Sequence, residues 1–122
     1  MTTTAHQKQA LGRYGEAVAE RHLVGRGLTV LDRNWRCDEG EIDLVLRHGD
    51  VLVVCEVKTR STDDFGSPHE AVDEVKLDRM RRLAQRWVTA HGLSRVPDVR
   101  LDLVAVRQPP RGAAVVEHVQ GL

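Results

Sequence analysis

The sequence predicts a single mixed α/β domain with the element order helix, three strands, helix, two strands. Its 122 residues, 41% hydrophobic and 30% charged, suit one ordinary globular domain. Apolar residues recur at helical spacing in two segments, and short valine-rich or alternating runs mark the strands. No repeat, linker or low-complexity tract divides the chain, so residues 1–122 are predicted to form one domain, with residues 1–5 disordered.

The first helix is predicted over residues 5–24, and Gly25 and Gly27 supply the signal that ends it. Its apolar side chains recur at roughly helical spacing: Ala10, Tyr14, Ala17, Val18 and Val24.

Five strands are predicted, at residues 28–35, 42–47, 51–57, 99–106 and 113–119. The third is rich in valine, as a buried strand usually is. Two helices and five strands in this order predict a layered arrangement in which helices flank a mixed sheet.

The second helix follows a polar segment broken by glycine and proline, and it is predicted to run to Gly92. Ser67 with Glu70 three residues later fits a capping box, and Asp73 offers an alternative N-cap. Its apolar face comprises Val72, Met80, Leu83, Ala84, Trp87 and Val88.

The chain has no bulk charge that would attract a polyanion or a membrane surface. Lys plus Arg and Asp plus Glu each number 18, so any such attraction must come from local patches. Cys37 and Cys55 form neither a disulfide framework nor a metal-binding knuckle, which favours reduced thiols. No segment resembles a signal peptide or a membrane span, so a cytoplasmic protein without a membrane partner is expected.

Four charged residues lie inside the predicted hairpin EIDLVLRHGDVLVVCEVK. A two-residue turn at residues 49–50 places Asp43 opposite Glu56 and Glu41 opposite Lys58, although a three-residue turn would shift this register. Opposed Cβ atoms lie about 5 Å apart, where like charges repel. Glu41 is assigned a supporting role, opposite Lys58 and orienting it.

A divalent cation would resolve the conflict between two facing carboxylates in an apolar hairpin. Mg²⁺ prefers oxygen ligands and is commonly held by one or two carboxylates together with phosphate oxygens. Lys58 follows Glu56 by two residues and points to the same face, where it could orient a water and stabilise charge developing on a phosphate. The alternative is a structural salt-bridge cluster without a metal.

The arrangement D-x12-E-x-K on a strand, turn and strand resembles that of the PD-(D/E)xK nuclease superfamily. Five ordered blocks, within residues 12–106, further resemble the YraN family of small bacterial proteins. They are GRYGEAVAERHL, GEIDLV, EVKTR, FGSPHEAVDEVKLDRMRRLA and RLDLVAV. This resemblance implies a restriction-endonuclease-like fold, similar to that of archaeal Holliday-junction resolvases.

The resemblance also implies roles for individual residues. Asp43 and Glu56 would bind Mg²⁺ or Mn²⁺, Glu16 would be an additional acidic ligand, and Lys58 would be the catalytic lysine. The proline that usually precedes the aspartate is replaced by Ile42, as it is in other resolvase-like members.

Glu16 has an alternative role as a solvated side chain that pairs with Arg13. Gly12 and Gly15 favour a site role, because helical glycine is unfavourable and indicates close approach of another backbone.

Local basic residues could bind a phosphate backbone: Arg60, Lys76, Arg79, Arg82 and Arg86. Lys76 points toward the core side of the second helix and is a candidate phosphate contact, unless it extends out to solvent. The arginines could equally form a solvated flank. Because aromatic residues are few, recognition of backbone and shape is favoured over base stacking.

Three other residues are assigned structural roles. His48 is predicted to lie at the surface in the turn, and Cys55 to be a small buried hydrophobe. Asp102 is predicted to be a structural hydrogen-bond or ion-pair partner, with a supporting role at the site as a weaker alternative.

The sequence and the resemblance together predict a metal-dependent endonuclease that acts on DNA, in preference to RNA, including branched or structured forms. Two alternatives stay open: a nucleic-acid-binding module of weak or no activity with the same fold, and a protein-interaction scaffold. Cleavage of two strands would need two sites, so a homodimer is also expected for the enzyme.

Overall fold

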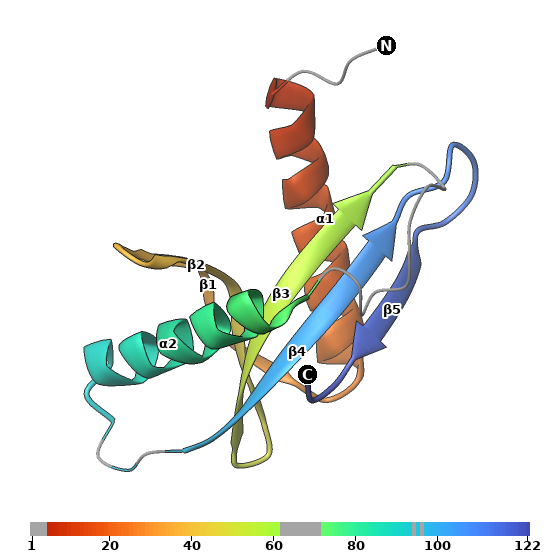
Figure 1. Cartoon of the computed structure of the whole chain (residues 1–122). Helices are drawn as coiled ribbons and strands as arrows, with labels where there is room; N and C mark the ends of the chain where they lie inside the picture. Colours follow the sequence, from red (N-terminus) through yellow and green to blue (C-terminus); the bar gives the residue numbers. More distant parts are fainter. Residues whose placement is uncertain (1–4, 62–71, 94, 96) are drawn as a thin grey trace.

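The computed structural model describes residues 5–61, 72–93, 95 and 97–122. It contains the predicted elements in the predicted order (Figure 1). They are α1 (Ala5–Gly25), β1 (Thr29–Cys37), β2 (Gly40–His48), β3 (Val51–Arg60), α2 (Glu74–Ala90), β4 (Asp98–Arg107) and β5 (Val115–Val119). Residues 1–5 were predicted to be disordered. Of these, residues 1–4 lie outside the described residues, and Ala5 is the first residue of α1.

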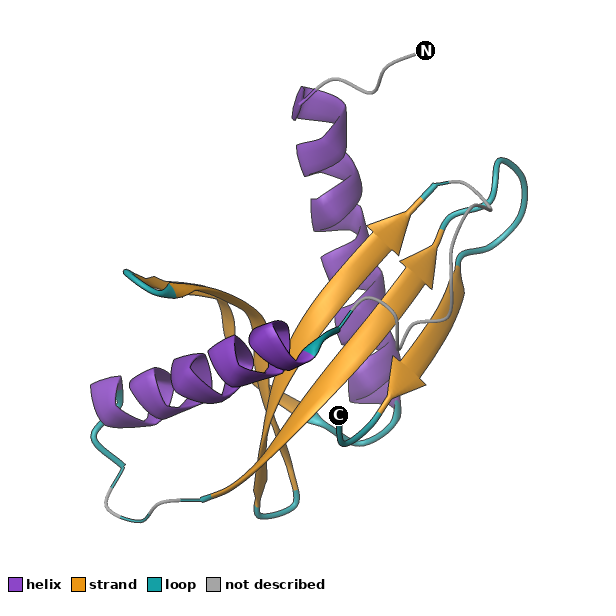
Figure 2. Ribbon diagram, in the orientation of Figure 1, coloured by secondary structure: helices purple, strands orange, loops and turns teal. Residues whose placement is uncertain are grey.

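One five-stranded sheet has the order β1-β2-β3-β4-β5, with β3 and β4 parallel and the other neighbours antiparallel. The parallel pair requires a crossover, which α2 provides. Figure 2 shows α1 and α2 on opposite faces of the sheet, which confirms the predicted mixed sheet flanked by helices. Neither helix of the described chain has both the length and the apolarity needed to cross a bilayer.

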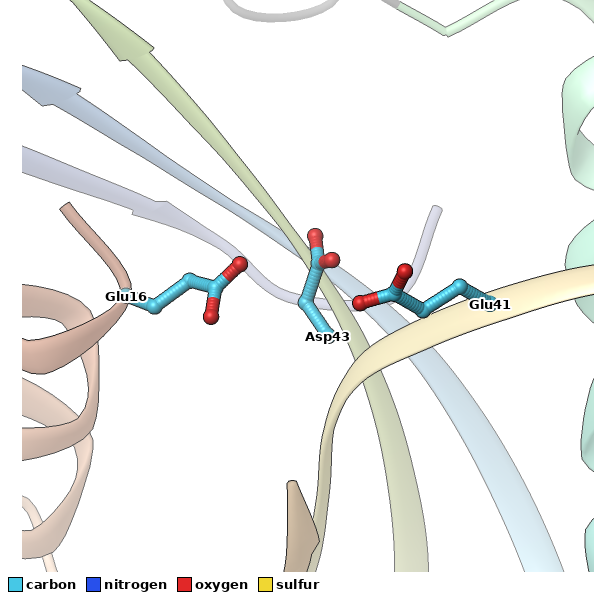
Figure 3. A group of neighbouring side chains, drawn as sticks. All are labelled: Glu16, Glu41 and Asp43. Atoms are coloured by element: carbon cyan, nitrogen blue, oxygen red, sulfur yellow. The ribbon is translucent and has the colours of Figure 1, made fainter. Parts of the chain in front are cut away.

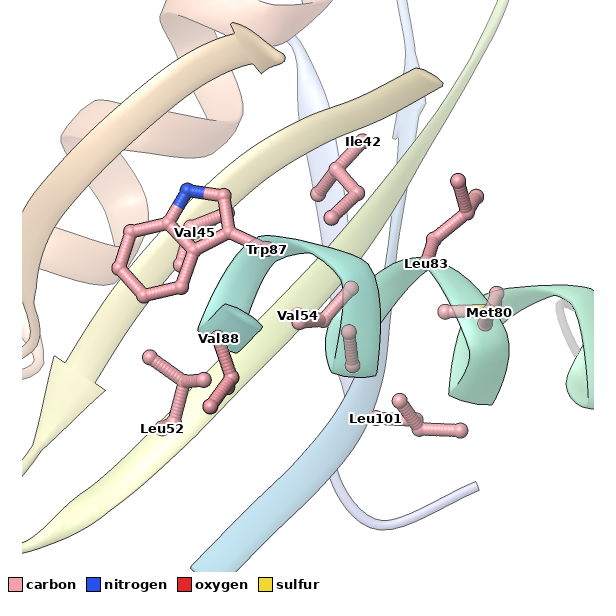
Figure 4. Close-up of a cluster of buried hydrophobic side chains, with 10 residues drawn as sticks. Ile42, Val45, Leu52, Val54, Met80, Leu83, Trp87, Val88 and Leu101 are labelled. Carbon is pink, nitrogen blue, oxygen red and sulfur yellow. The ribbon is translucent and has the colours of Figure 1, made fainter. Parts of the chain in front are cut away.

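The core has two parts, one under each helix. Under α2, Trp87, Leu83 and Met80 pack on Ile42 and Val54 of the sheet (Figure 4). These helix residues are those whose helical spacing predicts the buried face, because every third or fourth residue returns to the same side.

The buried face of α1 differs from the predicted one. Gly15, Ala19 and Leu23 are buried and Val18 is half-buried. The other four apolar residues of the predicted face are exposed: Ala10, Tyr14, Ala17 and Val24. The prediction was wrong because small residues, including a glycine, form the narrow stripe along which the helix contacts the sheet.

Asp73 is the N-cap of α2, which confirms one of the two predicted alternatives. Its side chain accepts a hydrogen bond from the backbone nitrogen of Lys76 at 2.8 Å. The other alternative, Ser67 with Glu70, lies outside the described residues. The helix ends at Ala90, and Gly92 just beyond has a positive φ of 56°, a conformation that favours glycine.

The β2–β3 hairpin has the predicted register over five pairs, from His48 with Val51 to Leu44 with Cys55. Beyond Leu44, β2 stays paired with β1 and the two strands curve away from β3 toward α2 (Figure 1). The expected opposed pairs of charged residues would lie past this divergence. The strands separate there because β2 follows its antiparallel partner β1 to the end of their own hairpin.

Candidate metal centre

Three carboxylates meet at the point where β2 leaves β3. Glu16 comes from α1, and Glu41 and Asp43 come from β2. One carboxylate oxygen of each lies within 4.8 Å of the others. Figure 3 shows Asp43 between the two glutamates, which reach toward it from opposite sides. We call these three residues the acidic cluster.

Glu16 reaches the acidic cluster because α1 approaches β3 closely at the preceding residue. A Cβ atom added to Gly15 would overlap the side chain of Thr59. A close approach is therefore confirmed at Gly15, but the group that approaches is a side chain and not the predicted backbone. The prediction is wrong at Gly12, where an added Cβ would have nothing within 4 Å.

Each member of the acidic cluster is held by neighbouring groups. The side-chain nitrogen of Asn34 donates to Glu16 Oε2 at 2.9 Å and to Glu41 Oε1 at 3.0 Å. The backbone nitrogen of Val57 donates to Asp43 Oδ2 at 2.8 Å. The Asp43 side chain thus contacts β3 at a point where the β2 backbone no longer pairs with it.

The pKa of Asp43 is raised to about 6, mainly by burial, and the nearby charges of Glu16, Glu56 and Glu41 contribute in the same direction. The hydrogen bond from Val57 opposes this rise but does not cancel it. The ionised form of Asp43 is therefore costly in the protein alone, and a cation would favour it.

Glu56 lies beside this cluster, on β3. Its Oε1 forms an ion pair with Lys76 Nζ at 2.9 Å, while its Oε2 is buried and has no hydrogen-bond partner among the described residues. Glu56 and Asp43 line the same small cleft of about 30 Å³, together with Glu41 and Arg79. A cleft of this size can hold a water molecule or an ion.

Lys58 is half-buried beyond the divergence of the strands. Partial burial and the positive charge of neighbouring Lys76 lower its pKa, while Glu56 acts in the opposite direction. Glu41 was expected to orient Lys58, but it accepts a hydrogen bond from Asn34 and pairs with Nε of Arg36 at 3.0 Å. Glu41 therefore contributes to the acidic cluster instead.

Asn34 is the site residue that sequence reasoning missed. It has the only positive φ (49°) of a non-glycine residue in the described ranges. Asparagine is disfavoured within strands and tolerates this left-handed conformation, so its occurrence in β1 was the available signal. The three-dimensional contact with Glu16 could not be read from one sequence.

Comparison with known proteins identifies the family. The sequence pattern of the group described as "Uncharacterised protein family UPF0102" matches residues 15–106. The chain belongs to the UPF0102 family. This confirms the family membership that the ordered sequence blocks predicted.

Curated UPF0102 proteins from three bacteria match the chain over nearly its full length. The protein of a Nocardioides strain is 63% identical over 94% of this chain and 92% of its own. That of Streptomyces coelicolor is 58% identical over 93% of this chain and 88% of its own. That of Kineococcus radiotolerans is 57% identical over 94% of both chains.

In this UPF0102 protein, two of the candidate phosphate-binding arginines are engaged within the chain. Arg86 forms ion pairs with Asp38 at 2.7 Å and with Glu39 at 3.2 Å, and Arg82 lies 3.6 Å from Glu39. Asp38 and Glu39 form the turn between β1 and β2, and their contacts with α2 were not predicted from sequence. Of the remaining arginine candidates, Arg60 and Arg79 are exposed.

Lys76 of this UPF0102 protein points to the sheet side of α2, as predicted. Its side chain is only 15% exposed, and it reaches Glu56 rather than extending out to solvent. It therefore contacts Glu56, a lining residue of the cleft, and neutralises one carboxylate of the candidate site.

Asp102 has the predicted structural role in the UPF0102 fold. It is fully buried and accepts two hydrogen bonds from Arg100, both at 2.9 Å, while His118 Nε2 lies 2.8 Å away. Cys55 is buried, as predicted, and burial raises the pKa of its thiol well above the usual value. His48, expected at the surface, is half-buried and contacts Arg100 at 3.1 Å.

Proposed function

We propose that the protein is a metal-dependent endonuclease that hydrolyses phosphodiester bonds of DNA, including branched or structured DNA. Asp43 and Glu56 would hold Mg²⁺ or Mn²⁺ with help from Glu16. The observation that carries the proposal is the buried Oε2 of Glu56, which has no partner in the described part of the chain, on a residue that lines the same cleft as Asp43. Buried polar atoms in native proteins nearly always have a partner, and a cation bound in this cleft would be one.

The residues present fit a hard divalent cation. All the candidate ligands are carboxylate oxygens, which Mg²⁺ and Mn²⁺ prefer. Repulsion from Glu16, Glu41 and Glu56 contributes to the raised pKa of Asp43, so positive charge is in deficit there. A divalent cation would neutralise a phosphate group and make a nearby water more acidic.

The surrounding cations would act on the substrate. Lys58 would orient the attacking water and stabilise charge that develops on the phosphate. Arg79, which lines the cleft, and Lys76, which pairs with Glu56, would contact phosphate oxygens. Arg60 would extend this contact at the end of β3. Arg82 and Arg86 would join them if phosphates displaced the acidic turn.

Cleavage assays with variants of the two central carboxylates test this proposal. Labelled linear, single-stranded and branched DNA, and RNA, are incubated with Mg²⁺ or Mn²⁺ and wild type, Asp43→Ala, Glu56→Ala or Asp50→Asn. We expect wild type to cleave DNA. Both alanine variants should lose about 100-fold or more of this activity, because each lacks a proposed metal ligand. Asp50→Asn should keep full activity, because its change lies in the exposed turn. No cleavage of any substrate by wild type, or undiminished cleavage by both alanine variants, would exclude the nuclease.

One observation favours the alternative of a nucleic-acid-binding module with the nuclease fold. Lys76 already neutralises Glu56, so one carboxylate of the site has a cation from the chain itself. Calorimetric titration with Mn²⁺ separates the two functions. Metal binding supports the nuclease, whereas salt-sensitive DNA binding without any metal binding supports the module.

A further inference from the structure

Asn34 connects two members of the acidic cluster that come from different elements. Its Nδ2 carries two hydrogens, and the two acceptors, Glu16 Oε2 and Glu41 Oε1, lie at 2.9 and 3.0 Å. Both acceptors are carboxylate oxygens, so only the nitrogen end of the amide can face them. One neutral group thereby holds two negative charges beside Asp43.

The backbone of Asn34 is specialised for this contact. The neighbouring residues pair regularly with β2, Arg33 with Leu44 and Trp35 with Ile42, so Asn34 lies across from Asp43 between two ordinary pairs. Its φ of 49° departs from the extended conformation of the strand. A non-glycine residue in this region costs of order 1 kcal/mol and persists where other contacts fix it, often at functional sites.

The hydrogen bonds of Asn34 leave the second oxygen of Glu16 for another ligand. On Glu41, by contrast, Arg36 occupies the second oxygen at 3.0 Å. Asn34 and Glu16 also line an open groove of about 440 Å³ between α1 and β1, with Arg13 and Arg21. The bridged pair is therefore accessible from solvent.

We propose that Asn34 is the positioning residue of the metal centre, holding Glu16 of α1 and Glu41 of β2 around Asp43 before the cation binds. This inference rests on the proposed function, because it concerns the placement of Glu16, one of the proposed ligands of that cation. Without Asn34, the two glutamates would repel each other and Asp43, and their side chains would move apart into solvent. Binding of the cation would then include the cost of bringing Glu16 back beside Asp43, which would lower the affinity.

The test compares Asn34→Gly with wild type by calorimetric titration with Mn²⁺ and by thermal unfolding in EDTA. Glycine removes the amide but suits a positive φ, so unfolding in EDTA should be unchanged or should occur at a higher temperature. The Mn²⁺ affinity should fall about 10-fold to 100-fold, as when other partners of metal ligands are removed. Thr29→Gly, at an exposed position of β1, controls for glycine in this strand and should bind Mn²⁺ like wild type.

A second variant, Asn34→Asp, keeps the side-chain shape and the tolerance of a positive φ but places a fourth carboxylate beside the cluster. We expect lower thermal stability than wild type in EDTA and a larger gain from saturating Mn²⁺. Equal Mn²⁺ affinities of wild type and Asn34→Gly, or equal stabilities of wild type and Asn34→Asp in EDTA, would overturn the positioning role. Failure of wild type to bind Mn²⁺ at all would instead reject the metal centre itself.

Discussion

The charge of Asp43 costs the protein stability as long as no cation is present. Its pKa is raised from 3.8 to about 6, so the folded state favours the protonated form. This preference stabilises the fold at low pH and is lost as the pH rises through about 6. Each pKa unit corresponds to about 1.4 kcal/mol, so the ionised carboxylate destabilises the metal-free protein by at most about 3 kcal/mol at neutral pH.

Replacing Asp43 with asparagine should therefore stabilise the metal-free protein. In EDTA at pH 7.5, chemical unfolding of Asp43→Asn should require more free energy than that of wild type, because the amide oxygen can still accept from Val57 without a charge. At pH 5 the difference should shrink, since wild-type Asp43 is then largely protonated. A difference that is the same at both pH values would show that its charge is not the cause.

Some site residues could be predicted from sequence and others could not. Strand alternation and turn length placed Asp43 and Glu56 near each other, and both line one cleft. The predicted pairing of Glu41 with Lys58 does not occur in the described sheet, because the register was extended past the last hydrogen-bonded pair of β2 and β3. The role of Asn34 depends on a backbone conformation and on a helix distant in sequence, neither of which has a periodic signal.

At the scale of the elements, Gly15 determines how closely α1 can approach the sheet. The residue before Glu16 has no room for a side chain, because Thr59 of β3 occupies the space that a Cβ would need. This single position therefore couples the packing of α1 to the placement of a candidate ligand.

Alanine at Gly15 should destabilise the fold by roughly 1–3 kcal/mol, since overpacking forces the helix or Thr59 to move. Gly12→Ala is the matched control in the same helix, where a Cβ meets nothing within 4 Å. That control should be neutral or gain up to about 1 kcal/mol from the better helix propensity of alanine. Urea unfolding of both variants provides the measurement, and equal stabilities would contradict the close packing.

Local sequence patterns predicted the helices and strands more accurately than they predicted which helix faces are buried. The apolar face of α2 was predicted correctly because its large side chains repeat at helical spacing. The buried stripe of α1 consists instead of Gly15, Ala19 and Leu23, and two of these are too small to produce a strong hydrophobic pattern. Its exposed Tyr14 supplied a misleading signal.

At the scale of the whole molecule, acidic and basic residues are equal in number, and some of them neutralise each other in local ion pairs. Asp38 and Glu39 in the β1–β2 turn neutralise Arg82 and Arg86 on α2. Both arginines are about half-exposed, and such exposed ion pairs are worth little individually, so an approaching polyanion could compete for the cations.

Neutralising that turn should increase affinity for nucleic acid. The double change Asp38→Asn with Glu39→Gln would leave Arg82 and Arg86 without their acidic partners in this turn. We expect the double variant to bind DNA several-fold more tightly than wild type at about 50 mM salt. This gain should fall at higher salt, because phosphate contacts release counterions. Fluorescence anisotropy with a labelled duplex measures it. Asp98→Asn with Glu117→Gln changes the net charge equally at exposed positions elsewhere, and an equal gain in that variant would mean that overall charge, not this turn, is responsible.

The tight hairpin of β2 and β3 has a consequence for the order of folding. Glu41, Asp43 and Glu56 all belong to one hairpin whose strands are joined by a tight turn, so closing it costs little chain entropy. The parallel pairing of β3 with β4 must wait for the intervening helix, and Glu16 arrives only when α1 docks. We therefore expect Glu41, Asp43 and Glu56 to be brought together before Glu16 joins them, so that their mutual repulsion acts before α1 docks.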